Sequence, residues 1–307
     1  MDIVVENLSK SFGPQKAIDS ISFQVKRGEV LGFLGPNGAG KTTTMKIISC
    51  FLFPDAGNVQ VGNYSIRKHA AQIRQHIGYL PEHNPLYDEM NVIDFLQFIA
   101  RIHNIPRYRI TARILDMLRL CGLEKEKYKN IRELSKGYKQ RVGLAQALIH
   151  DPEVVLLDEP TTGLDPNQIV EIREMIRTIG REKTIIFSSH LLTQVEATCN
   201  RVLIIHKGKI AADGTSAELR LTYTEKLLRL VVEGGNTEAV FNLLTGIPDV
   251  EDVEITEENS FRIQAGRNAP VEKDIFQLCE ANGWYIKELV PIEERLEDIF
   301  RQVTQSS

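Results

Sequence analysis

A glycine-rich segment at residues 35–43 constrains the fold of this chain more than any other feature. It reads Gly-Pro-Asn-Gly-Ala-Gly-Lys-Thr-Thr and matches the phosphate-binding loop pattern G-x-x-x-x-G-K-[ST]. The apolar run at 29–34 is typical of a buried strand, and residues 44–48 read as the opening of a helix. Together they predict a strand–loop–helix unit that holds phosphate; the alternative is a glycine-rich turn that merely ends in Lys-Thr.

The residue types in this segment suit the phosphates of a nucleotide. Glycines let successive backbone N–H groups point into one anion-sized hollow, and the helix that follows adds its N-terminal partial positive charge. Lys41 should reach the β- and γ-phosphates, and the Thr42 hydroxyl should ligate Mg²⁺. The predicted cradle consists of Gly35, Pro36, Asn37, Gly38, Ala39, Gly40, Lys41, Thr42 and Thr43.

Two adjacent carboxylates, Asp158 and Glu159, end a second buried strand that begins at Val154. Buried parallel strands present functional groups at their carboxyl ends. Asp158 is the natural acid on the Mg²⁺ side of a phosphate-loop hydrolase, and Glu159 is the natural base for the attacking water. A solvated strand end is the alternative, but the phosphate loop upstream favours a catalytic pair.

Other positions are suited to contacts with a nucleotide. Phe12, in a turn predicted at 9–14, either packs at the edge of the core or stacks on a flat ring such as adenine. Ser135 and Gly137 stand at the start of a predicted helix, where an anion can bind. His190 ends the apolar strand that begins at Thr184 and is a candidate γ-phosphate sensor, although a lone histidine is usually a satisfied surface or core residue.

The length of 307 residues suits two domains. Residues 1–220 carry the motifs, with a helical insert at about 83–150, and Asp165 in this part is expected to cap a helix from about 167 to 180. Residues 221–307 show the order β-α-β-β-α-β of a ferredoxin-like α+β domain, with an assembly or regulatory role. The predicted fold class is α/β, a phosphate-loop nucleotide hydrolase sheet with a helical insert plus this small C-terminal domain.

The composition excludes several classes of protein. The net charge of −4 does not favour binding to nucleic acid, which usually requires a basic domain or stripe. The four cysteines lie far apart without a C-x-x-C motif, which fits a reduced compartment. The N-terminus reads as a short strand and not as a signal peptide, and no apolar run approaches the ~20 residues that span a bilayer. A membrane role would therefore require a partner.

The motifs occur in an order that resembles the ATP-binding cassette of ABC transporters, over about residues 1–220. The resemblance is carried by the phosphate loop, the Leu-Ser-Lys-Gly-Tyr signature at 134–138, the Asp158-Glu159 pair, the Gly-Leu-Asp turn at 163–165 and His190. It implies that Phe12 stacks on adenine, that Asp158 supports Mg²⁺, that Glu159 activates water and that His190 contacts the γ-phosphate.

The resemblance also implies that two cassettes enclose two ATP molecules head to tail, as a homodimer or with another cassette. Each ATP would lie between one phosphate loop and the Ser135/Gly137 signature of the other subunit. Lys136 and Tyr138 replace the usual Gly and Gln of this signature. The two cassettes should therefore still close around ATP, but with an altered affinity. Glu82 stands where the family has a glutamine, and a carboxylate there can still ligate Mg²⁺ and couple to a partner.

A finer resemblance concerns the exporter group of this family. Its members with Pro-Glu at this position commonly work with a separate membrane subunit, and the tail at 294–300 looks like theirs. Within the group, residues 134–141 and 165–168 look most like the gliding-motility ATPase of Bacteroidetes-type bacteria. The interpretation is thus a Mg²⁺-dependent ATPase of a bacterial ABC exporter, peripheral on the cytoplasmic face of the cell membrane and bound to an integral membrane permease.

Two alternatives come from other functional classes. A soluble ABC-type factor acting on ribosomes or DNA usually has two cassettes or long basic or coiled-coil inserts, whereas this chain has one cassette and a pI near 6.0. A nucleotide-binding regulator without hydrolysis is disfavoured by the presence of Glu159 and His190.

Overall fold

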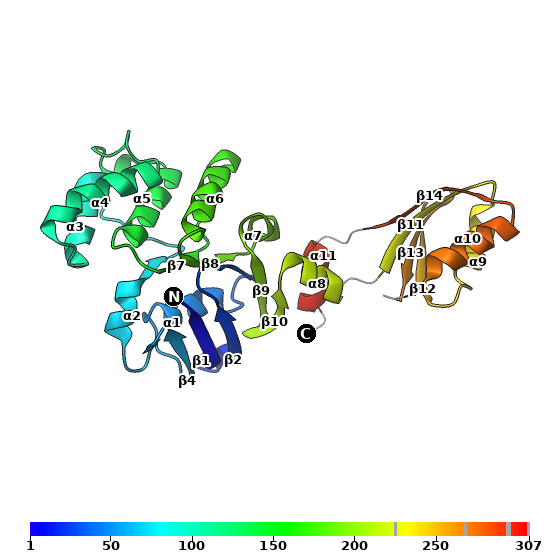
Figure 1. Ribbon diagram of the computed structural model, residues 1–307, viewed down its shortest axis with the longest axis horizontal. Helices are drawn as coiled ribbons and strands as arrows, with labels where there is room; N and C mark the ends of the chain where they lie inside the picture. Colours follow the sequence, from blue (N-terminus) through cyan, green and yellow to red (C-terminus); the bar gives the residue numbers. More distant parts are fainter. Residues whose placement is uncertain (224–225, 267–268, 293–295, 306–307) are drawn as a thin grey trace. The chain divides into compact units, whose positions relative to one another are not determined.

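The computed structural model describes residues 1–223, 226–266, 269–292 and 296–305. The chain divides into two compact units, Met1–Ser216 and Ala217–Ser307 (Figure 1). Each unit has its own hydrophobic core.

A six-stranded sheet forms the centre of the first unit. Its strand order is β10-β9-β3-β8-β7-β6, with parallel pairing from β9 to β6 and antiparallel pairing between β10 and β9. Strands β3, β7 and β8 are buried at every residue, which is typical of a parallel sheet covered on both faces. The strands are β3 Val30–Leu34, β6 Ile77–Leu80, β7 Val154–Asp158, β8 Thr184–Ser189, β9 Arg201–His206 and β10 Lys209–Gly214.

A second sheet of order β2-β1-β4-β5 is antiparallel. The predicted turn at 9–14 is wrong in part, because residues 9–12 continue β1 and only Gly13 and Pro14 make the turn. The strand continues because cross-strand pairing satisfies its backbone, for example between Phe12 and Gln15. The strands are β1 Ile3–Phe12, β2 Gln15–Val25, β4 Ala56–Val61 and β5 Tyr64–Ser65.

Helix α1 (Lys41–Ile48) joins the two sheets into one core. Its Met45 and Ile48 pack in a single apolar cluster with Val5 of β1 and with Leu31 and Phe33 of β3. The phosphate-loop segment directly before α1 is therefore anchored at both ends by buried structure.

The predicted helical insert is present as a group of helices that lie together in Figure 1. Helices α3 and α4 each bury an apolar stripe, but Ile102 at the C-terminal end of α3 is exposed. Short helices α2 and α7 were not predicted, since seven residues are too few for an apolar period; α2 buries only Ile73. Besides α1, the helices of the first unit are α2 Ala70–His76, α3 Val92–Ile102, α4 Arg107–Leu120, η1 Ile131–Glu133, α5 Lys136–Leu148, α6 Pro166–Gly180 and α7 Leu192–Thr198. Of these, α3, α4, η1 and α5 lie within the insert.

The second unit contains the predicted split βαβ arrangement. Its antiparallel sheet has the order β12-β13-β11-β14, and α9 and α10 contribute to its core. Helix α11 includes most of the predicted exporter-type tail, but residues 294 and 295 of that tail lie outside the described residues. The elements are α8 Ser216–Tyr223, β11 Lys226–Glu233, α9 Thr237–Leu244, β12 Val250–Glu257, β13 Ser260–Ala265, α10 Val271–Ala281, β14 Tyr285–Pro291 and α11 Leu296–Gln305.

Across the described ranges, none of the helices combines the length and apolarity needed to cross a membrane.

Candidate nucleotide-binding site

The topology of the large sheet gathers four predicted segments at one edge. Strands β3, β8, β7 and β6 are consecutive neighbours and run parallel. The phosphate loop follows β3, His190 follows β8, Glu159 follows β7 and Glu82 lies two residues beyond β6. This carboxyl edge is where open parallel sheets bind their ligands.

The phosphate loop needs its glycines for two different reasons. Gly40 has φ +111°, a left-handed conformation, and a Cβ there would also lie 2.6 Å from the Ala17 carbonyl oxygen. Gly35 is required for space, because its Cβ would lie 2.4 Å from the Ile205 carbonyl oxygen. A side chain at either position would displace the loop from β2 or β9.

Lys41 is held inside the loop with only 5% of its surface exposed. Its Nζ donates to the carbonyl oxygens of Gly35 at 2.7 Å and Pro36 at 3.2 Å. The same Nζ lies 3.6 Å from Glu159 Oε1. Burial lowers the pKa of Lys41, and the charges of Glu159 and Asp158 oppose that shift.

Asp158 is completely buried at the end of β7. Ser188 of β8 donates from its hydroxyl to Asp158 Oδ1 at 2.7 Å, whereas Oδ2 is buried without a hydrogen-bond partner. Burial raises the pKa of Asp158, and the hydroxyls of Ser188 and Thr42 act in the opposite direction. An unpartnered carboxylate oxygen beside a threonine hydroxyl fits the oxygen ligands that Mg²⁺ prefers.

Glu159 has a left-handed backbone, with φ 49°, directly after a buried strand. Its N–H donates to Ser188 Oγ at 3.0 Å. Its Oε2 lies 2.9 Å from His190 Nδ1 and accepts from Thr162 Oγ1 at 3.2 Å. A non-glycine residue in this conformation is strained by ~1 kcal/mol or more, and such strain concentrates at functional sites.

Glu82 and Phe12 are both exposed. Glu82 lines a cavity of about 480 Å³ together with Thr42 and Asp158, and its charge raises the pKa of Asp158. Phe12 exposes 51% of its surface at the end of β1, with Lys10 Nζ 5.8 Å from the ring centroid. The ring is accessible to a planar ligand.

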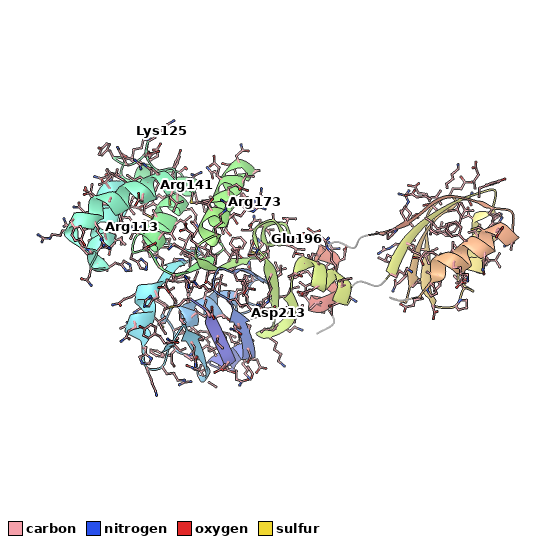
Figure 2. The ribbon with its side chains drawn as sticks, in the orientation of Figure 1. Arg113, Lys125, Arg141, Arg173, Glu196 and Asp213 are labelled. Atoms are coloured by element: carbon pink, nitrogen blue, oxygen red, sulfur yellow. The ribbon has the colours of Figure 1, made fainter. Side chains whose placement is uncertain are left out.

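The signature segment is docked on α6. Ser135 is the N-cap of α5 and accepts from the Tyr138 N–H at 3.4 Å. A Cβ on buried Gly137 would lie 2.5 Å from the Gln168 amide oxygen, so α5 and α6 approach closely here. Arg141 of α5, labelled in Figure 2, pairs with Glu171 of α6.

Asp165 is the N-cap of α6, as predicted, and accepts from the Gln168 N–H at 2.9 Å. Asp165 therefore begins the helix whose Gln168 side chain lies against Gly137 of the signature. Among the residues with described coordinates, no hydrogen bond or ion pair joins the signature to the phosphate loop.

Two residues of the site were not assigned a role from the sequence. Ser188 bridges the two acids by contacting both Asp158 and Glu159, and Tyr79 of β6 has a buried hydroxyl in the same cavity as Asp158. The available signal for Ser188 was a small polar residue that directly follows the apolar run Ile185–Phe187 in a buried strand. Tyr79 gave no comparable signal, since a tyrosine in a strand is ordinary core packing.

Both units of the chain are similar in sequence to known protein families. The profile described as ABC transporter matches residues 18–162, and the profile of the DrrA1-3-like ATP-binding protein C-terminal domain matches residues 214–304. The linearmycin resistance ATP-binding protein LnrL of Bacillus subtilis is 33% identical over 303 residues, which is 97% of each chain. The bacitracin transport ATP-binding protein BcrA of Bacillus licheniformis is 32% identical over 302 residues, 97% of this chain and 95% of that one.

A solved structure of an ATP-binding subunit of an ABC transporter has the same fold in the first unit. It superposes with a TM-score of 0.67 at 29% identity, over 73% of this chain and 93% of that one. These full-length relatives and the convergence of Lys41, Asp158 and Glu159 lead to one assignment. The chain belongs to the ABC transporter family as one of its ATP-binding subunits, and its activity is ATP hydrolysis.

Proposed function

We propose that this ATPase binds ATP with Mg²⁺ at the carboxyl edge of the large sheet and drives a separate membrane permease that exports its substrate. The observation that carries the proposal is the position of Glu159. One carboxylate oxygen lies 3.6 Å from the loop lysine, and the other lies 2.9 Å from His190. An acid held between a phosphate-binding cation and a histidine is placed to act on a terminal phosphate.

The residues of the chain have distinct roles in this proposal. Backbone N–H groups of residues 35–43 surround the phosphates, and Lys41 turns from its loop carbonyls to the β- and γ-phosphates. Thr42 and Asp158, with Glu82 nearby, hold the cation, which neutralises charge that develops on the phosphates. Phe12 stacks on adenine.

Glu159 orients the attacking water and accepts its proton, since it is buried and ready to hydrogen-bond. His190 fixes the carboxylate of Glu159 and contacts the γ-phosphate. The strained backbone at Glu159 aims its side chain out of β7 and toward the loop lysine.

We infer that hydrolysis requires a second cassette, either an identical chain or another. Ser135 and Gly137 stand at the N-terminus of the 13-residue helix α5, which suits binding to phosphate. In the described part of the chain they are bonded to neither the phosphate loop nor Lys41. Two chains placed head to tail would supply each ATP with one phosphate loop and one signature.

The permease surface is proposed at about residues 82–105, peripheral on the cytoplasmic face of the membrane. Glu82 lines the cavity beside Asp158, so this segment can transmit the state of the nucleotide outward. Relatives named for antibiotic resistance and bacitracin transport favour an exporter over a soluble factor acting on ribosomes or nucleic acid. The narrower resemblance to gliding-motility ATPases stays a prediction.

The mass of the Glu159→Gln protein in solution, with and without ATP and Mg²⁺, tests the proposal. A shift from monomer to dimer on ATP would support the two-cassette arrangement with an identical chain. A protein that binds ATP and stays monomeric would mean that the changed signature residues or the absence of a partner block closure. A protein that binds no ATP would overturn the proposed site.

A further inference from the structure

The cavity beside the phosphate loop contains an unusual concentration of unsatisfied polar atoms. Four buried side-chain atoms that lack a hydrogen-bond partner belong to residues lining this 480 Å³ space. Nearly all buried polar groups in proteins are hydrogen-bonded, and the volume is ample for several waters at roughly 30 Å³ each. The four atoms are Tyr79 OH, Asn84 Nδ2, Gln146 Oε1 and Asp158 Oδ2.

Tyr79 is the member of this group whose chemistry points to the metal side of the site. It lies on β6, adjacent to β7, and its side chain is partly buried against the core of the unit. The surroundings of its hydroxyl are acidic, because the carboxylates of Asp158 and Glu82 both interact with the Tyr79 side chain. A tyrosine hydroxyl carries one hydrogen and can donate it in one hydrogen bond.

We propose that Tyr79 is a positioning residue for the divalent cation, donating its hydroxyl hydrogen bond to the oxygen shell of the ion held by Thr42 and Asp158. The inference rests on the proposed function, which places the cation at Asp158. It adds a residue that no motif of the sequence identified. Groups that hydrogen-bond to metal ligands typically change metal affinity by 10–100-fold.

The free protein provides an argument against a purely structural role. The hydroxyl makes no hydrogen bond within the described part of the fold, so its replacement by hydrogen should leave the stability of the free protein unchanged or raise it. Tyr79→Phe keeps the ring that packs on the core and removes only the hydroxyl. If a partner arrives with nucleotide and metal, the same change should weaken the metal-bound state alone.

The test measures Mn²⁺ affinity of the ADP complex by electron paramagnetic resonance in the full chain. Tyr79→Phe should weaken Mn²⁺ binding by about 10-fold. Its ADP affinity in the presence of EDTA and the thermal midpoint of the nucleotide-free protein should not fall. Tyr128→Phe, at a well-exposed tyrosine outside the cavity, is the matched control and should leave all three values unchanged.

Asp158→Asn separates failure of this inference from failure of the proposed function. If Asp158→Asn loses Mn²⁺ affinity while Tyr79→Phe does not, the role of Tyr79 is overturned and the metal site stands. If Asp158→Asn binds Mn²⁺ as the wild type does, the proposed metal site itself is wrong. A Tyr79→Phe protein that is less stable without nucleotide and binds Mn²⁺ normally would also overturn the inference, since the hydroxyl would then be structural.

Discussion

The two units of the chain bury very different side chains. The first unit buries three charged groups together, Lys41, Asp158 and Glu159. Within the described ranges of the second unit, the buried polar side chain is Ser260, and it is hydrogen-bonded to Thr256 at 3.0 Å. Buried charges cost several kcal/mol each unless they are well paired, so the first unit trades stability for a reactive site.

The backbones of the two units differ in the same way. In the first unit, Glu159 has a positive φ immediately after a buried strand, where turn formation does not require it. In the described part of the second unit, the non-glycine residues with positive φ are Asp249 and Asn259, types that tolerate this conformation in turns. The first unit also has positive φ values away from the site, for example at Ser20, Cys50 and Lys207, but Glu159 brings this conformation into the site itself, whereas the second unit is locally consistent with its fold.

The largest effect on ATP affinity is expected from removing the loop lysine. Lys41→Ala should lower ATP affinity by about 100-fold or more, which is about 3 kcal/mol, because the phosphates lose their cation and Glu159 is left near no positive charge. Binding of a fluorescent ATP analogue measures the change. Lys68→Ala, at an exposed lysine of the same unit, should bind normally; nucleotide affinity retained in Lys41→Ala would contradict the phosphate-loop assignment.

The next effect separates binding from chemistry within the same unit. Glu159→Gln should slow ATP turnover by ~10²–10⁴, about 3–5 kcal/mol of barrier, while ATP still binds. The amide keeps the size of the side chain but cannot accept the proton of the water. Phosphate release measures turnover, and exposed Glu182→Gln is the control. Wild-type turnover in Glu159→Gln would remove Glu159 from the mechanism.

The sequence predicted most reliably those segments whose residue pattern is compatible with few local structures. The phosphate loop, the buried strands before it and before Asp158, and the helix capped by Asp165 are all present where the motifs predicted them. The β-α-β-β-α-β order also predicted the split βαβ arrangement of the second unit, because few topologies suit that order.

What the sequence could not provide was contact between distant segments. The link from Ser188 to both acids depends on β7 and β8 being neighbours at a particular register, in which Asp158 lies opposite Ser188. The unpartnered hydroxyl of Tyr79 depends on a cavity between elements. Neither is encoded in a local pattern, so only the folded chain reveals them.

A change in the second unit tests whether its core is independent of the nucleotide site. Phe261→Ala removes a fully buried ring from β13, the strand between β11 and β12, and should destabilise this unit by ~3–5 kcal/mol. ATP affinity should stay unchanged, since Phe261 packs in the core of the second unit. Differential scanning calorimetry of the full chain measures the first value, with exposed Phe276→Ala as the control. Loss of ATP binding in Phe261→Ala would show that the two units do not fold separately.

The smallest expected effect, that of Asp158→Asn, tests directly whether the buried charge of the site lowers the stability of the first unit. Burial raises the pKa of Asp158, so the folded state holds this proton more tightly than the unfolded state does. The tighter binding of this proton therefore stabilises the folded state at low pH, and that stabilisation is lost as pH rises through the raised pKa of Asp158. Asp158→Asn should consequently stabilise the nucleotide-free protein at neutral pH by about 1 kcal/mol, as replacement of an active-site charge often does.

A gain in stability is consistent with the proposed mechanism, because the Asp158→Asn protein should at the same time lose its metal-dependent turnover. Urea unfolding with EDTA at neutral pH and at pH well below the ordinary range of the carboxyl measures the difference, which should disappear in acid. Asp116→Asn, at an exposed position of α4, should show no such gain. A less stable Asp158→Asn protein at neutral pH would mean that the bond from Ser188 and the attraction of Lys41 outweigh burial. The charge at Asp158 would then stabilise the free fold, and the contrast between the two units would rest on Glu159 alone.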